Sequence, residues 1–317
     1  MNVDTLRVSV TDRCNLRCIY CNPLGARGRE NPAGILSFDE ICQVVRLGVE
    51  CGVRRVRLTG GEPLMREGIC DLVRRLAAIE GLDDLALTTN GVRLERMAAG
   101  LKDAGLKRVN ISLDAAEPLC YREMTGSNLL PQVLAGMHRA LEIGLTPVRI
   151  NCVVMRDANL SQVAALAEMT VRLPVSVRFI EYCPTTISTK PASCSVSNRE
   201  VRGLIEGRFG RMSGVVQPDA GGPAVYFRIP GAEGTIGFIS GRTSVFCHRC
   251  NRLRLTSDGR IKPCLHAGQS YDLRALMKEG VGDEALRSLI VRIIREKGRH
   301  TRLNSFAGDF LMQSIGG

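Results

Sequence analysis

The chain of 317 residues is long enough to bury a substantial core, as one large domain or as two. Its 44% hydrophobic and 24% charged residues exclude a disordered chain, and no run of 18 apolar residues suggests a membrane helix. The net charge of +11 attracts anionic partners, but only 4% of the residues are aromatic, which argues against stacking on single-stranded nucleic acid. The first residues lack the features of a signal peptide, so we expect a cytoplasmic protein.

The first half of the sequence alternates between short apolar strands and amphipathic helices. The expected strands cover 6–12, 54–59, 85–90, 108–114, 148–154 and 175–181, and the expected helices cover 37–52, 67–79, 92–104, 131–143 and 159–170. Ser37 and Glu40 form a capping-box pattern at the start of the first helix. A complete barrel needs eight strand–helix units. The six units that begin with these six strands therefore predict an α/β fold of the incomplete (βα)6 TIM type over residues 1–182.

The regular alternation of strands and helices does not continue in residues 183–317. A polar connector leads to a short helix near 199–210, then to two strands within 224–240 and to a hairpin that turns at Asp258 and Gly259. Two further helices are expected near 270–278 and 283–296. We expect this second region to be an α+β cover packed on the barrel.

Polar residues follow the expected strands of the first half. The segments TD, TGGEP, TTNG, SLD and RFIEY all stand where a strand ends. Parallel barrels build their sites from the carboxyl ends of their strands. The sequence therefore predicts a functional site on that face.

Three of the 13 cysteines, Cys14, Cys18 and Cys21, lie in one loop after the first strand. An odd number of cysteines in a chain of this size favours metal chemistry over a disulfide scaffold. A structural zinc normally takes four ligands, and the first 50 residues offer only Cys42, inside an expected helix, as a fourth. Three thiolates favour an iron–sulfur cluster with one iron left for another ligand.

A second triad consists of Cys247, Cys250 and Cys264. A zinc ribbon with His248 or His266 as the fourth ligand is the alternative here. Two arginines, at positions 252 and 254, lie between Cys250 and Cys264 on one face of the expected strand, and such a pair suits a phosphate-bearing substrate.

The first triad, with Tyr20 before its last cysteine and GGEP after the second strand, resembles the radical S-adenosylmethionine (SAM) superfamily. The resemblance implies that Cys14, Cys18 and Cys21 bind a 4Fe-4S cluster. In that superfamily the open iron binds SAM, and reduction of the cluster cleaves SAM to a 5′-deoxyadenosyl radical.

Nearly the whole chain is similar to one branch, the GTP 3′,8-cyclases of molybdenum cofactor biosynthesis. The segments that carry this likeness are RVSVTDRCNLRCIYC, RVRLTGGEPLMR, LTTNG, NISLDA, RFIEY, FCHRCNRLRLTSDGRIKPCL and the terminal GG. The likeness implies a lyase that cyclises GTP to (8S)-3′,8-cyclo-7,8-dihydroguanosine 5′-triphosphate, the first step of that pathway. The radical would remove hydrogen from the ribose 3′ carbon, after which the ribose attacks carbon 8 of guanine.

The same likeness assigns roles position by position. Cys247, Cys250 and Cys264 would bind a second 4Fe-4S cluster that faces the guanine base. Tyr20, Gly61, Thr88, Ser112 and Cys183 would contact SAM, although Cys183 replaces the methionine usual in the family. GTP, mainly through its triphosphate, would bind Arg7, Arg55, Arg57, Arg149, Arg178, Arg252 and Arg254. The tail residues Gly316 and Gly317, which otherwise have the character of a frayed end, would assist catalysis.

The implied partners are GTP, a reductant such as flavodoxin or ferredoxin, and the downstream cyclic pyranopterin monophosphate synthase. Nucleic acid and membrane are not expected as partners, and a homodimer stays open. Two alternatives to the cyclase are a peptide-modifying radical SAM enzyme with an auxiliary cluster and a non-enzymatic protein that binds zinc or nucleic acid. The departures at Asn22, Cys183 and 184–199 leave room for a relative with an altered substrate.

Overall fold

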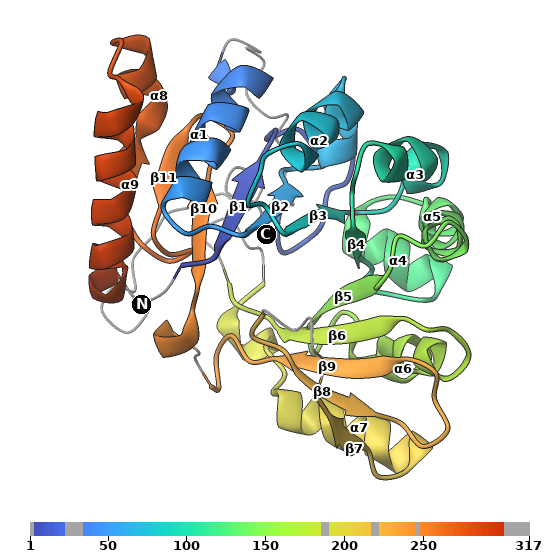
Figure 1. Ribbon diagram of the computed structural model, residues 1–317. Coiled ribbons are helices and arrows are strands. Elements are labelled where there is room, and N and C mark those ends of the chain that lie inside the picture. The colour runs from blue at the N-terminus through green and yellow to red at the C-terminus, as the bar shows by residue number, and fades with distance from the viewer. Residues whose placement is uncertain (1–2, 23–33, 185–189, 217–221, 245–246, 301–317) are drawn as a thin grey trace.

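The computed structural model describes residues 3–22, 34–184, 190–216, 222–244 and 247–300. One curved, open sheet forms its centre, with the helices packed around the outside (Figure 1). The strand order is β12-β11-β10-β1-β2-β3-β4-β5-β6-β9-β8-β7. The expected α/β fold with an incomplete barrel is confirmed.

The six strands expected in the first half form the middle of this sheet, and neighbours run parallel. They are β1 (Thr5–Ser9), β2 (Arg55–Thr59), β3 (Asp84–Thr89), β4 (Arg108–Ser112), β5 (Arg149–Val154) and β6 (Ser176–Glu181). Their apolar side chains alternate with polar ones, since one face packs on the helices and the other lines the inside of the barrel.

Helices connect these strands and cover the outer face. They are α1 (Phe38–Glu50), α2 (Ile69–Ala77), α3 (Leu94–Asp103), α4 (Pro118–Thr125), α5 (Leu130–Glu142) and α6 (Val163–Arg172). The predicted capping box at α1 is confirmed: the Ser37 side chain accepts from the Glu40 backbone N–H, and the Glu40 carboxylate accepts from the Ser37 N–H. The sequence reading missed α4, a short helix that begins at a proline.

The C-terminal region continues the same sheet at both of its sides. Strand β10 (Arg252–Leu255) pairs in parallel with β1, and β9 (Thr235–Ile239) pairs in parallel with β6. The outer strands on the β10 side are β11 (Arg260–Lys262) and β12 (Tyr271–Asp272), and those on the β9 side are β8 (Val225–Arg228) and β7 (Ser213–Val215). The expected cover therefore adds two parallel strands to the barrel wall. The division at residues 182 and 183 stays a prediction.

Three helices complete this region: α7 (Asn198–Phe209), α8 (Leu273–Lys278) and α9 (Asp283–Glu296). Helix α9 lies beside α1 (Figure 1), and the two are joined by a hydrogen bond from Gln43 to Asp283 of 2.6 Å. Helix α7 is fixed to β6, because the buried Glu181 carboxylate accepts the backbone N–H of Asn198 at 3.1 Å. No helix in the described ranges is long and apolar enough to span a bilayer.

Candidate active site

The N-terminal cysteine loop follows β1 and is held by backbone hydrogen bonds on two sides. On one side the N–H of Gly61, after β2, donates to the Thr11 carbonyl oxygen at 2.6 Å. On the other side the N–H of Arg17 donates to the Thr125 carbonyl oxygen, at the end of α4, at 2.8 Å. These bonds place Cys14, Cys18 and Cys21 at the carboxyl end of the barrel.

Gly61 is required by the packing of this loop. A Cβ atom on Gly61 would lie 2.2 Å from the Arg13 carbonyl oxygen, which no side chain can accommodate. The next residue, Glu62, is buried, and its carboxylate accepts the Asn90 N–H at 2.7 Å and the Thr89 hydroxyl at 2.7 Å. The GGEP segment thus joins the cysteine loop to the ends of β2 and β3.

Tyr20 has a buried partner that the sequence reading did not identify. Its hydroxyl donates to Asp114 at 2.8 Å, and the other oxygen of that carboxylate accepts the Val153 N–H at 2.8 Å. Burial raises the pKa of Asp114 to about 6, although these two hydrogen bonds act in the opposite direction. Asp114 therefore fixes the ring of Tyr20 beside the cysteines.

Burial keeps the N-terminal thiols protonated in the cluster-free chain. It raises the pKa of Cys14, raises that of Cys18 well above its usual value, and raises that of Cys21 to about 12, with help from Cys14 and Asp114. Thiols in such surroundings ionise when a metal supplies positive charge. Three half-buried cysteines at one end of a cavity fit a cluster that takes three protein ligands.

The second triad has different electrostatic surroundings. Burial acts to raise the pKa of Cys250, but the charges of Arg252 and Lys297 outweigh it and lower the pKa to about 7. Lys297 follows α9 and donates through Nζ to the carbonyl oxygens of Arg252 at 2.7 Å and Pro263 at 2.5 Å. It thereby ties the segment after Cys250 to the segment before Cys264.

The two triads lie at opposite ends of the barrel. Strands β1 and β10 are parallel, with Thr5 opposite Arg252. Cys14 to Cys21 follow the carboxyl end of β1, whereas Cys247 and Cys250 precede the amino end of β10. One cavity of about 400 Å³ is lined by all six cysteines and by every other predicted site residue in the described ranges. Gly316 and Gly317 lie outside those ranges.

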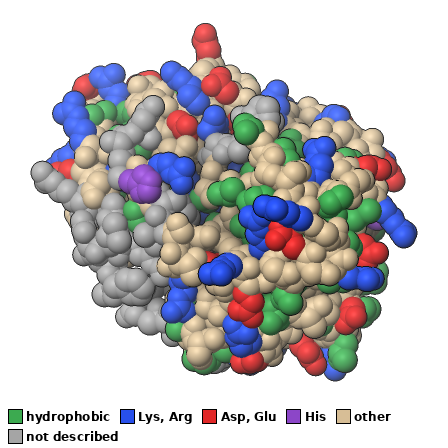
Figure 2. Space-filling view, turned by 90° about the horizontal axis from the view of Figure 1, so that it is seen from below, with side chains coloured by type: hydrophobic (Ala, Val, Ile, Leu, Met, Phe, Trp, Pro, Cys, Tyr) green, Lys and Arg blue, Asp and Glu red, His purple; other side chains and the backbone are tan. Residues whose placement is uncertain are grey.

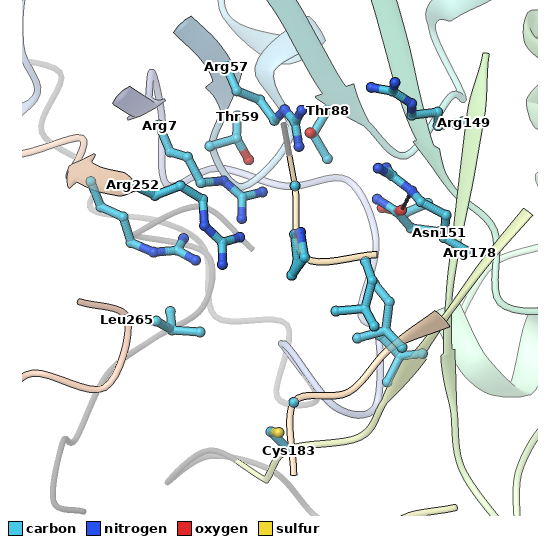
Figure 3. Close-up of a pocket in the computed structure, with 18 of the residues that line it drawn as sticks. Arg7, Arg57, Thr59, Thr88, Arg149, Asn151, Arg178, Cys183, Arg252 and Leu265 are labelled. Carbon is cyan, nitrogen blue, oxygen red and sulfur yellow. Dashed lines mark hydrogen bonds between the residues drawn. The ribbon is translucent and has the colours of Figure 1, made fainter. Parts of the chain in front are cut away.

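Several arginines line this cavity, and Figure 3 shows Arg7, Arg57, Arg149, Arg178 and Arg252 around it. Arg7 pairs with Arg254 on one side and with Arg57 on the other, so the three side chains point to the same face. Burial and then repulsion by the other arginines lower the pKa of Arg7 and of Arg57 well below the usual value, and lower those of Arg149 and Arg254 to about 10. The buried Nε of Arg57 has no hydrogen-bond partner among the described residues. Such a concentration of positive charge is stabilised by a bound polyanion.

The predicted arginines are not equivalent. Arg55 forms an ion pair with Asp4 at 3.2 Å, and its side chain is 39% exposed. Arg178 is buried and donates to the side-chain oxygen of Asn151 at 2.9 Å (Figure 3) and to that of Asn110 at 2.7 Å. Protein groups already orient these two side chains, whereas no described residue accepts a hydrogen bond from Nε of Arg57.

The predicted SAM contacts are distributed along the carboxyl half of the cavity. Thr88 and Ser112 line it from β3 and β4. Cys183 follows β6, and a Cβ on Gly241 would lie 3.0 Å from its sulfur. The cavity also contains residues that the sequence reading missed, among them Asp84, Asn90, Arg108 and Lys297. Arg108 could have been found, because it precedes Ser112 by four residues on the same expected strand and so shares its face.

No group of three His, Cys, Asp or Glu side chains within the described residues is arranged to hold a single metal ion. In a four-iron cluster the irons and bridging sulfides lie between the thiolates, so that the thiolates need not converge on one point.

Comparison with known proteins now identifies the family. Residues 8–170 match the model of the radical SAM superfamily, and residues 175–303 match the model "Molybdenum Cofactor Synthesis C". A curated GTP 3′,8-cyclase of Pelotomaculum thermopropionicum is 45% identical over 99% of this chain and 98% of its own length. The chain belongs to the GTP 3′,8-cyclase family of radical SAM enzymes. A GTP 3′,8-cyclase of Geobacter sulfurreducens is 42% identical over 99% of this chain and 97% of its own.

Solved structures show the same fold. Streptococcus suis SuiB bound to S-adenosylmethionine is similar with a TM-score of 0.62 and 16% identity, over 90% of this chain and 68% of that one. Methylornithine synthase is similar with a TM-score of 0.52 and 16% identity, over 66% and 63%. Membership of the superfamily implies one 4Fe-4S cluster and SAM as cofactors.

Proposed function

We propose that this chain is a GTP 3′,8-cyclase and carries out the first step of molybdenum cofactor biosynthesis. The observation that carries the proposal is one cavity that has a cysteine triad at each end and buried or half-buried arginines between the triads. The full-length similarity to curated cyclases supports the same activity.

A nucleoside triphosphate fits the charges of this cavity. Arg254 is buried and Arg7 and Arg57 are half-buried, and the three lie side by side in the sheet, so their repulsion is relieved when phosphate oxygens accept their N–H groups. Arg149 and Arg178 extend the same positive surface to β5 and β6. The face in Figure 2 mixes acidic and basic side chains in its described part, so the net charge forms no broad basic surface there that would suit nucleic acid.

Both ends of the cavity then have a role. When bound, the N-terminal cluster and SAM supply the 5′-deoxyadenosyl radical. Thr88, Ser112 and the fixed Tyr20 position SAM, and the arginines hold the ribose within reach of it. Cys247, Cys250 and Cys264 bind a second 4Fe-4S cluster that receives the guanine base. The walls exclude water from the reaction.

The other roles belong to this same proposal. A flavodoxin or ferredoxin supplies electrons, and a cyclic pyranopterin monophosphate synthase consumes the product. The protein is cytoplasmic, and Gly316 and Gly317 assist catalysis.

The first test asks whether the 5′-deoxyadenosyl radical removes the hydrogen atom from the ribose 3′ carbon of GTP. The protein is reconstituted anaerobically with iron and sulfide and is given dithionite, SAM and GTP deuterated at the ribose 3′ carbon. We expect deuterium in the 5′-deoxyadenosine, measured by mass spectrometry. SAM cleavage that leaves the 5′-deoxyadenosine free of deuterium would reject the proposal.

The metal content provides a second test. Two clusters require about eight irons per chain and a brown protein. A colourless protein that contains zinc and retains it after anaerobic purification would contradict both cluster assignments.

A further inference from the structure

Arg108 lines the cavity but is not among the arginines that the sequence motifs indicated. It is the first residue of β4 and is 7% exposed. In the sheet, Arg57 pairs with Ala86, and Ala86 pairs with Arg108. Because alanine is small, no long side chain on β3 separates Arg57 from Arg108 at this level of the barrel.

The described residues provide hydrogen-bond acceptors for only part of the Arg108 guanidinium. Its Nε donates to Asp84 Oδ1 at 3.1 Å, and its Nη2 donates to Asp84 Oδ2. The third nitrogen, Nη1, is buried and has no hydrogen-bond partner among the described residues. Asp84 thus fixes the plane of the guanidinium while one buried donor remains to be satisfied.

The surroundings of Arg108 carry excess positive charge. Burial and repulsion by Arg108, among others, lower the pKa of Arg57 and of Arg149. The acidic residues among the described lining of the cavity are Asp84 and Glu181, and Glu181 is engaged by the N–H groups of Arg242 and Thr243 at 2.8 and 2.9 Å. Asp84 alone does not balance the arginines, so this corner of the cavity suits an anion.

The sheet order indicates which part of a nucleotide reaches this corner. The second triad adjoins β10, at one side of the parallel strands, and β4 lies four strands further along. In the proposed function the guanine base lies at that triad. The triphosphate then extends across β1 and β2 toward β4, and its far end is the terminal phosphate.

We propose that Arg108 is a substrate-binding residue that recognises the terminal phosphate of the nucleoside triphosphate through Nη1, together with Arg57. The inference rests on the proposed function, because it takes the position of the base from it. Asp84 is the positioning residue that aims Arg108. Together, Arg57 and Arg108 make the site selective for a nucleoside triphosphate over a diphosphate.

The experiment measures equilibrium binding of GTP, GDP and GMP to the cluster-loaded protein without reductant. Arg108→Gln is expected to weaken GTP binding about tenfold, as for the loss of one charge-assisted hydrogen bond, and to change GDP and GMP binding little. Arg139→Gln, which breaks an ion pair of 3.1 Å with Glu142 on the exposed face of α5, is the matched control and should bind as the wild type does. Arg108→Lys, which keeps the charge, should recover part of the preference for GTP.

A double variant separates direct contact from a structural role. If Arg108 serves only to neutralise Asp84, then Asp84→Asn combined with Arg108→Gln should restore the wild-type affinity for GTP, and this result would overturn the proposal. If Arg108 contacts the phosphate, the double variant keeps the loss of GTP affinity.

The single variant gives further outcomes. Equal weakening of GTP, GDP and GMP binding by Arg108→Gln would also overturn the proposal for Arg108. Failure of the wild type to bind GTP would overturn the proposed function as well, whereas an unchanged GTP preference in Arg108→Gln overturns this assignment alone.

Discussion

The two cysteine triads offer the same ligands in opposite electrostatic surroundings. Burial raises the pKa of Cys21 to about 12, and Asp114 adds to that effect. The pKa of Cys250 falls to about 7, because Arg252 and Lys297 outweigh the effect of burial. Negative surroundings disfavour the addition of an electron to a cluster, and positive surroundings favour it. The N-terminal end therefore suits a strong electron donor, and the C-terminal end suits an anionic substrate.

Removing one ligand from each triad is expected to have the largest effect. Cys18→Ala should abolish the cleavage of SAM, because the cluster that reduces SAM is lost. Cys250→Ala should retain some cleavage but yield no cyclised nucleotide. The assay quantifies 5′-deoxyadenosine and nucleotide products by chromatography, and iron should fall by about four per chain in each variant. Identical product profiles for the two variants would contradict the division of roles.

Thiol reactivity in the cluster-free chain tests the difference between the surroundings of the two triads. At pH 7 about half of Cys250 is thiolate, whereas Cys21, with a pKa of about 12, is almost wholly protonated. Iodoacetamide should therefore label Cys250 more than about 100-fold faster than Cys21. The rate of labelling at Cys250 should rise between pH 6 and pH 8 and then level off. Mass spectrometry of tryptic peptides measures both rates. Similar rates at the two sites would show that their surroundings do not differ as described.

The arginines between the triads provide a matched pair on one strand. Arg57→Met should weaken GTP binding by about 10- to 100-fold, because a half-buried guanidinium that faces the cavity is lost. Arg55→Met should weaken it only a few-fold, since Asp4 already engages Arg55. Without GTP, the Arg57 variant should melt at a higher temperature than the wild type, because a buried repulsion is removed. Calorimetry measures the affinity for GTP and the melting temperature. Equal losses of GTP affinity in the Arg57 and Arg55 variants would refute the distinction between these two arginines.

A smaller effect is expected from Lys297→Met. Removing this charge from beside Cys250 should lower the reduction potential of the proposed second cluster by on the order of 60 mV, which corresponds to a tenfold change for one electron. Lys297→Arg keeps the charge and should keep the potential. An EPR-monitored redox titration separates this effect from a loss of iron. A shift in the potential of the N-terminal cluster instead would place Lys297 at the wrong end of the cavity.

Features defined by local spacing were predicted from the sequence. The cysteine triads, the capping box at Ser37 and the arginines two residues apart on a strand all follow from short-range pattern. Their convergence on one cavity follows because parallel strands bring inward side chains together.

Features that depend on distant partners were missed. Nothing near Arg252 indicates that its strand pairs with β1, and nothing near Lys297 indicates a contact with the carbonyl oxygens of Arg252 and Pro263. Asp114 was recognised as a polar strand end but not as the partner of Tyr20, 94 positions away in the chain. Contacts of this kind are set by the packing of the whole sheet rather than by local preference.

The place of β1 inside the sheet has a consequence for biosynthesis. Asp4 lies beside Asn251, 247 positions later in the sequence, so β1 stays unpaired on one side until the ribosome has made β10. At usual rates of translation this takes roughly 10 to 50 s. A fragment that ends at residue 182 exposes the edges of both β1 and β6 and is expected to aggregate, which size-exclusion chromatography would show. Insertion of the clusters should accordingly follow the release of the finished chain.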